Sequence, residues 1–187
     1  MPMDGEACRV WEERQDLRHE FDGAQIFAMT GGTNAHAAIQ RNLIFSLTGR
    51  LRGQPCQPFG SKLKIRTQTS IRYPDAFVTY SRGEPNATVV ADPVVIFEIL
   101  SRSTAKQDLG AKNTEYQSIP SVQRYVVLQQ THRAADVFFR TKEEDNPWAF
   151  EFLSDGDVLD MPEIGISIPL AEIYEDIALA GRGLKSL

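Results

Sequence analysis

The sequence predicts one α/β (α+β) domain, residues 1–187, in which helices flank a central mixed β-sheet. A chain of 187 residues has room for one domain. An amphipathic pattern predicts a helix over 33–52, with apolar residues at four-residue spacing: Ile39, Leu43, Leu47 and Leu51. A nearly unbroken apolar run over 93–100 predicts a central strand that is buried on both faces.

The other elements are shorter and are placed by alternation of polar and apolar residues and by turn residues. An Asp22-Gly23 turn predicts a hairpin within 20–27, and Lys62–Arg66 alternates as a half-exposed strand does. We further expect a helix over 103–118 and a short helix after Pro169, together with strands near 76–80, 124–129, 134–140, 149–153 and 164–168.

Composition narrows the class of protein. Apolar residues make up 42% and charged residues 24%, as in ordinary globular domains, which excludes disordered and collagen-like chains. Two cysteines, Cys8 and Cys56, are too few for a disulfide framework and are not spaced as paired metal ligands. The charged first 20 residues lack the apolar core of a secretory signal, and the longest apolar run is too short to cross a bilayer. We therefore expect a cytoplasmic protein that does not enter a membrane.

Charge is distributed very unevenly along the chain. Twenty basic and 25 acidic residues give a net charge of −5, which by itself argues against a nucleic-acid partner. Residues 23–74, however, contain no acid and carry seven basic residues: Arg41, Arg50, Arg52, Lys62, Lys64, Arg66 and Arg72. Such a block fits either a surface that contacts a polyanion or a solvated face that is balanced by acids elsewhere in the fold.

Two carboxylates are candidates for a metal site. Glu98 interrupts the apolar strand, and burying it as an unpaired ion is costly, so it requires a metal, a cationic partner or a place at the open end of the strand. Asp75 follows Pro74 and opens the strand expected near 76–80. An Asp in this place is more commonly a turn or cap residue. If the two strands are neighbours, both carboxylates can bind one hard cation such as Mg²⁺.

A lysine follows the strand that contains Glu98. Lys112 lies on the expected helix, from which its ammonium can reach back to the end of that strand. There it can hold a phosphate or orient an attacking water. The alternative is an exposed pair of Asp108 and Lys112 at i,i+4 spacing, which contributes only a few tenths of a kcal/mol. Tyr116 is expected to pack.

These residues occur in a recognisable order. The motifs are His19-Glu20-Phe21-Asp22-Gly23, Asn34-Ala35-His36, Arg72-Tyr73-Pro74-Asp75, Phe97-Glu98-Ile99-Leu100-Ser101, Asp108-Leu109-Gly110-Ala111-Lys112, Tyr116, Ile119-Pro120-Ser121, Tyr125-Val126-Val127 and Ile168-Pro169-Leu170-Ala171-Glu172. Over most of its length the chain resembles the Uma-two family of restriction-endonuclease-like proteins, a branch of the PD-(D/E)XK nuclease superfamily. The resemblance implies a restriction-endonuclease-like fold.

The resemblance also implies a function, that of a Mg²⁺-dependent endonuclease that hydrolyses DNA, with Mn²⁺ as an alternative metal. Asp75, Glu98 and the backbone carbonyl of Ile99 would hold the metal, and Glu20 from the opening hairpin is a candidate for a further ligand or a solvated residue. The parent superfamily places its lysine where this chain has Leu100, so the resemblance implies that Lys112 supplies this charge from the helix.

The acid-free block then becomes a candidate surface for DNA. Its proposed contacts are Arg41, Lys62, Lys64, Arg66 and Arg72, with His36 as either a phosphate contact or an ordinary helix residue. A homodimer is expected, with the apolar segment 137–139 as a candidate edge. Three hypotheses remain: a Mg²⁺-dependent nuclease, an inactive nuclease-fold binding or assembly protein, and an unrelated domain with structural acids.

Overall fold

The computed structural model describes residues 5–12, 14–29, 31–67, 69–100, 107–143 and 147–179. Its largest sheet has six strands in the order β11 (Trp148–Ser154), β10 (Ala134–Arg140), β9 (Arg124–Gln129), β8 (Pro93–Leu100), β6 (Ala76–Thr79) and β3 (Gln57–Gly60). Strands β8 and β9 pair in parallel and the other neighbours pair antiparallel, so the sheet is mixed. The predicted mixed α/β architecture is confirmed.

A smaller sheet lies beside the main sheet in the chain order, with strands before, between and after β3 and β6. Its five strands are ordered β2 (Ile26–Ala28), β1 (His19–Phe21), β5 (Ile71–Arg72), β4 (Lys64–Arg66) and β7 (Val89–Val90). A separate hairpin pairs β12 (Val158–Met161) with β13 (Ile166–Pro169). Because β5 lies directly before β6 in the chain, the smaller sheet leads into the main sheet through residues 73–75.

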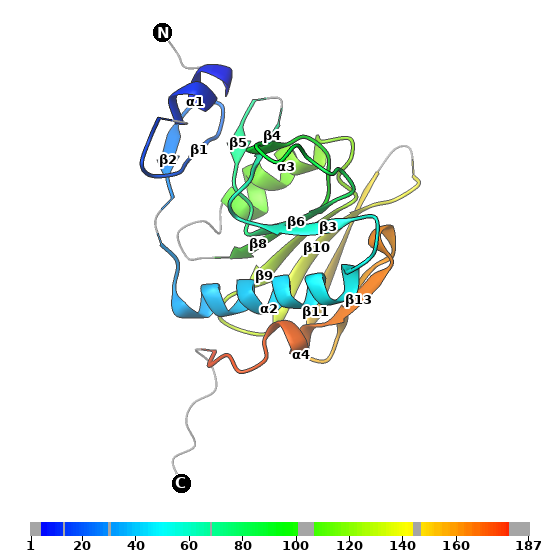
Figure 1. The fold of residues 1–187 in the computed structure, drawn as a ribbon. Coiled ribbons are helices and arrows are strands. Elements are labelled where there is room, and N and C mark those ends of the chain that lie inside the picture. Colours follow the sequence, from blue (N-terminus) through cyan, green and yellow to red (C-terminus); the bar gives the residue numbers. More distant parts are fainter. Residues whose placement is uncertain are drawn as a thin grey trace.

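Helices lie on both sides of the main sheet (Figure 1). The helical elements of the described residues are α1 (Gly5–Glu12), which lies beside the smaller sheet, α2 (Asn34–Leu51), the π-helical turn η1 (Gln107–Ala111), α3 (Lys112–Gln117), the 3₁₀ turn η2 (Pro162–Ile164) and α4 (Leu170–Ile173). One apolar core joins α2 and α4 to one face of the sheet, and includes Ile39, Leu43 and Leu47. The second core joins Tyr116 of α3 to the other face.

Successive residues of β8 face these two cores in turn. Phe97 and Ile99 belong to the core beneath α2, whereas Ile96 belongs to the core beneath α3. This alternation is the period-two pattern of a strand. Glu98 consequently faces the α3 side, and the predicted central strand buried on both faces is confirmed.

Several predicted elements are confirmed closely. The helix expected over 33–52 is α2, and the hairpin expected within 20–27 is formed by β1 and β2. The helix expected over 103–118 is shorter in the described part, a π-helical turn followed by α3, and residues 103–106 lie outside the described residues.

Two expectations differ from the structure. Residues 5–12 form a helix that the charged sequence did not indicate. The segment 137–139 is not an edge, because β10 pairs with β9 on one side and β11 on the other.

Among the described residues, no helix is both long enough and apolar enough to span a bilayer.

Candidate active site at the carboxyl end of strand β8

Strand β8 continues beyond its antiparallel partner, and this overhang forms the candidate site. Ala76, the first residue of β6, pairs with Phe97, so Glu98, Ile99 and Leu100 extend past β6. Asp75 precedes β6 and therefore lies beside the overhang. The chain order thus brings the two predicted carboxylates to the same end of the sheet.

Asp75 is held against the backbone of β8. Its Oδ2 accepts a hydrogen bond from the backbone N–H of Ile99 at 2.8 Å and lies 3.1 Å from Nε2 of His36. Thr33 caps α2 by accepting a hydrogen bond from the His36 N–H, which places His36 at the start of the helix. The Asp75 carboxylate is thereby fixed between α2 and β8, at the backbone N–H of the residue that follows Glu98.

Glu98 is buried and meets groups from α3. Its Oε1 accepts hydrogen bonds from Nζ of Lys112 at 3.0 Å and from the hydroxyl of Tyr116 at 2.9 Å. The Glu98 and Lys112 side chains are each only 5% exposed. Burial raises the pKa of Tyr116 well above its ordinary value, and the neighbouring charge of Glu98 raises it further, so Tyr116 is a neutral donor.

Glu20 is a second carboxylate beside Lys112. Its Oε2 lies 3.5 Å from Nζ of Lys112 and 3.3 Å from Nη1 of Arg72, while Oε1 accepts the backbone N–H of Tyr73 at 3.0 Å. Strand β1 positions this carboxylate by pairing with β5, which contains Arg72. Glu20 is therefore engaged by two cations and one amide, rather than solvated on the hairpin.

Arg72 is completely buried and binds carboxylates of its own chain. Its Nε and Nη2 donate to the two oxygens of Glu115, each at 2.8 Å. Burial alone lowers the pKa of a guanidinium, but the hydrogen bonds and the charge of Glu115 raise the pKa of Arg72 overall. The prediction that Arg72 contacts DNA does not agree with this burial.

Lys64 is also inside the protein. Its Nζ lies 2.6 Å from Oε2 of Glu12, and the hydroxyl of Tyr73 donates to the other oxygen of Glu12 at 2.8 Å. Lys64 and Glu12 are 5% and 6% exposed, respectively. Lys64 therefore joins α1 to β4, and its predicted contact with DNA does not agree with its position either.

The other three basic candidates lie at the surface. Arg41 on α2, Lys62 in the turn between β3 and β4, and Arg66 at the end of β4 are exposed. Arg41 donates to the side chain of its neighbour Asn42. The structure thus separates the acid-free block into exposed cations and buried structural ones.

The oxygen atoms of the site fit a hard divalent cation. Asp75 uses Oδ2 for its hydrogen bonds, and within the described residues no hydrogen bond reaches its Oδ1. The N–H and C=O of one strand residue point to the same side of the strand, so the Ile99 carbonyl points to the side on which Asp75 lies. Asp75, Glu98 and this carbonyl therefore offer three oxygen donors of the kind that Mg²⁺ prefers.

Glu20 is held by donors of its own chain, and its expected role as a further metal ligand stays a prediction. In the part of the chain that the structure describes, no three or more His, Cys, Asp or Glu side chains form a group that could hold a metal. The donors of Lys112, Arg72 and the Tyr73 amide already surround the Glu20 carboxylate. Its position fits a counter-ion for Lys112.

Sequence reasoning missed the roles of three residues. Tyr116 was expected only to pack, and Glu115 was not singled out, although they bind Glu98 and Arg72, respectively. Their spacing from Lys112 was the available signal, because residues three or four positions apart lie on one helix face. Gln40 was also missed. Its side chain donates to the Asp75 carbonyl from α2, and the four-residue spacing from His36 indicates the shared face.

Comparisons with known proteins identify the family and the fold. The model of the Uma2 family, described as "Putative restriction endonuclease", matches residues 6–171. Two uncharacterized Synechocystis proteins are similar: slr1290 is 32% identical over 90% of this chain and 89% of its own, and sll1609 is 29% identical over 64% and 70%. An Anabaena variabilis crystal structure, described as "a putative nuclease belonging to DUF820", has the same fold. Its TM-score is 0.69 at 17% identity, and the match covers 86% of this chain and 91% of that one. The chain belongs to the Uma2 family of restriction-endonuclease-like proteins.

Proposed function

We propose that this protein is a Mg²⁺-dependent endonuclease that hydrolyses phosphodiester bonds in DNA. The observation that carries the proposal is the meeting of Asp75, Glu98 and Lys112 at one end of β8. Two carboxylates and an ammonium at the open end of a sheet are the groups that metal-assisted phosphodiester hydrolysis requires.

Each of these residues has a distinct role. Asp75, Glu98 and the Ile99 carbonyl would hold Mg²⁺, with Mn²⁺ as an alternative. When bound, the ion polarises the scissile phosphate and lowers the pKa of water near it. Lys112, whose ammonium lies beside Glu98, stabilises the negative charge that develops on the phosphate oxygens. Glu20 keeps Lys112 in place.

The exposed cations supply the contact with DNA. Arg41, Lys62 and Arg66 are accessible to a polyanion, whereas Lys64 and Arg72 are not and are left out of this role. Contacts with the backbone phosphates position DNA without reading its sequence. His36, beside Asp75, is a further contact in this proposal. A homodimer and a cytoplasmic location remain predictions.

Plasmid nicking tests the proposal. Wild-type protein should nick supercoiled DNA in Mg²⁺, and Asp75→Asn or Glu98→Gln should lower the rate by about 100-fold or more. Glu84→Gln, in the exposed loop after β6, is the matched control and should leave the rate unchanged. Mg²⁺ should also raise the melting temperature of the wild type and not that of Glu98→Gln, which is a readout independent of cleavage.

The opposite results favour the rival function. If wild type and Asp75→Asn are equally inert with Mg²⁺ and Mn²⁺, and Mg²⁺ leaves the melting temperature unchanged, the nuclease proposal is wrong. The chain would then be a nuclease-fold protein that serves in binding or assembly.

A further inference from the structure

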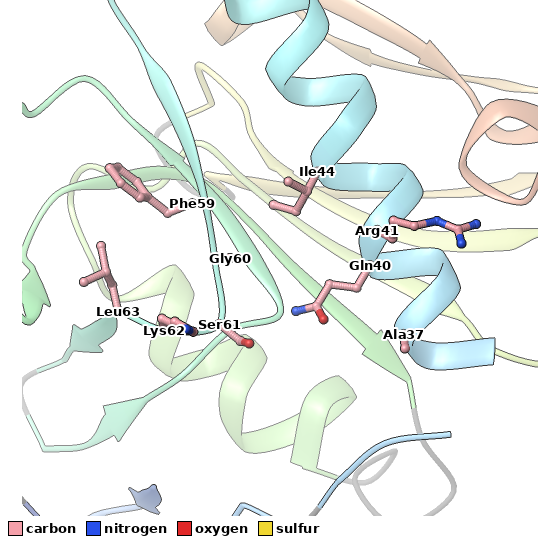
Figure 2. Close-up of a pocket in the computed structure, with 9 residues that line it drawn as sticks. All are labelled: Ala37, Gln40, Arg41, Ile44, Phe59, Gly60, Ser61, Lys62 and Leu63. Carbon is pink, nitrogen blue, oxygen red and sulfur yellow. The ribbon is translucent and has the colours of Figure 1, made fainter. Parts of the chain in front are cut away.

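We propose that the groove between α2 and β3 binds an unpaired nucleotide of the DNA strand, so that the enzyme prefers single-stranded segments over duplex. This inference deepens the proposed function and rests on it. It assigns a substrate class to a surface beside the candidate active site, whose lining includes Gln40, Gly60 and Leu63 (Figure 2).

The groove lies close to the candidate active site. Gly60 pairs with Ala76, and Ala76 pairs with Phe97, so the three residues form one row across the sheet. Two strand spacings, about 10 Å, therefore separate the groove from the residue before Glu98. The amide of Gln40 connects the two regions directly, because Nε2 donates to the Asp75 carbonyl at 2.7 Å. A strand with its phosphate at Asp75 can place an adjoining nucleotide in the groove.

The charge around the groove suits a nucleic-acid strand. Arg41 contributes a cation from α2 and Lys62 contributes one from the β3–β4 turn. Arg18 donates to the carbonyl of Ser61, another lining residue, and brings a third cation to the same edge. Among the lining residues that the structure describes, none is acidic. Phosphates can therefore lie along the rim without facing a carboxylate.

The interior suits a base better than a phosphate. Ala37 and Ile44 supply apolar surface from α2, whereas Phe59 and Leu63 border the groove with side chains that pack into the core on the α3 face. Figure 2 shows Gln40 extending from α2 toward β3. Because Nε2 of Gln40 is committed to Asp75, its Oε1 is directed elsewhere and can accept a hydrogen bond from a base. Apolar side chains against which a base can pack, with cations at the rim, suit an unpaired base.

The size of the groove points in the same direction. Its volume of about 430 Å³ lies within the range of about 300–1,000 Å³ that is typical of sites for small molecules. One nucleotide fits such a space. A paired base must leave its stack to enter it, at an energetic cost that an unpaired base does not incur.

Gly60 allows the groove to be filled without rebuilding the fold. A Cβ atom at Gly60 would lie 3.9 Å from both the Asp75 carbonyl and Cδ1 of Ile44, which is ordinary contact. Gly60→Leu therefore adds a side chain between α2 and β3. The matched control is Gly49→Leu, on the exposed side of α2, where a Cβ would have no neighbour within 4 Å. A second filling variant, Ala37→Leu, approaches from the helix.

Binding is measured by fluorescence anisotropy in EDTA at one fixed salt concentration, with a labelled single strand, the same sequence as duplex, and an abasic strand of equal charge. The wild type should bind the single strand more tightly than either of the others. Gly60→Leu and Ala37→Leu should each weaken binding of the single strand by about tenfold, the order expected when one base loses its place on the protein. Neither should change binding of the duplex, and Gly49→Leu should change nothing.

Several results would overturn the inference: equal affinity for single strand and duplex, equal affinity for the intact and abasic strands, or unchanged single-strand binding by both filling variants. Thermal unfolding identifies a variant that fails to fold, in which case the other filling variant decides. Because EDTA removes divalent metal from the binding assay, the groove can be shown to bind a nucleotide even if the nuclease proposal fails. Conversely, Glu98-dependent nicking together with unchanged binding by the filling variants rejects the groove alone.

Discussion

At the scale of single residues, Lys112 is the cation on which the site depends most. It is buried and contacts two carboxylates, those of Glu98 and Glu20. Removing one partner of a buried ion pair costs more than the pair contributes, because it leaves an uncompensated charge. The same lysine therefore has a structural effect that is measurable without substrate.

We predict that Lys112→Met lowers the free energy of unfolding by about 3–5 kcal/mol, the range for a broken buried pair. Urea denaturation at neutral pH provides the measurement. The control is Arg133→Met, since Arg133 and Asp155 form a more exposed pair with side chains 29% and 51% accessible, and it should cost about 1 kcal/mol or less. Equal losses in the two variants would show that the burial of Lys112 has no energetic consequence.

Residue placement was predictable only in part. The meeting of Asp75 with the Glu98 strand followed from motif order, because Asp75 precedes one predicted strand, Glu98 lies within another, and the two strands are neighbours. The burial of Lys64 and Arg72 was not predictable, because their partners Glu12, Glu20 and Glu115 lie 43 to 52 positions away in the chain. Summing charge over a segment cannot distinguish a solvated cation from one paired across the fold.

At the scale of elements, α1 illustrates an attachment that depends on one carboxylate. Glu12 is the last residue of this helix and binds Lys64, the hydroxyl of Tyr73 and the backbone N–H of His19. Burial by itself raises the pKa of Glu12, but the hydrogen bonds from Lys64 and Tyr73 outweigh burial and lower the pKa overall. The attachment is therefore strongest when Glu12 is ionised.

This shift predicts an acid-sensitive contribution to stability. Because the pKa of Glu12 is lower in the folded state, its contribution is complete above the ordinary value of 4.5 and disappears as the pH falls through the folded value. Glu12→Gln should therefore be less stable than wild type at pH 7 and lose less on acidification, as measured by urea denaturation at a series of pH values. Glu151→Gln, on exposed β11, should follow the wild-type curve. Parallel curves for Glu12→Gln and wild type would contradict the assignment.

Long, strongly patterned elements were the ones that could be predicted. Strand β8 and helix α2 have enough residues for their apolar periods to be recognised. Strands β5 and β7 have two residues each, too few to show alternation, and exist because neighbouring strands supply their hydrogen-bond partners. Helix α1 was missed because its charged residues were interpreted as solvated, whereas Glu12 points inward.

At the scale of the whole molecule, the net charge of −5 describes the proposed DNA-binding surface poorly. The relevant charge is local, at Arg41 and Lys62 beside the groove. Salt dependence measures this local charge, because each phosphate contact releases condensed counterions. The affinity for DNA should therefore fall as salt rises, despite the acidic composition.

We predict that replacing Arg41 and Lys62 together by Ala reduces the slope of log affinity against log salt by about 0.7 for each lost contact with a single strand. Arg82→Ala is the control, because this exposed arginine follows the end of β6 that is remote from Asp75. A titration of binding against salt provides the measurement. An unchanged slope in the double variant would place the DNA on another surface.

The network around Lys112 also has a consequence for the timing of biosynthesis. Its members come from β1, β5, β8 and α3, and the first and last of them are Glu20 and Tyr116. A nascent chain cannot assemble the site until Tyr116 has left the ribosome, by which point more than half of the protein has been made. The proposed nuclease activity therefore cannot begin before that stage of translation.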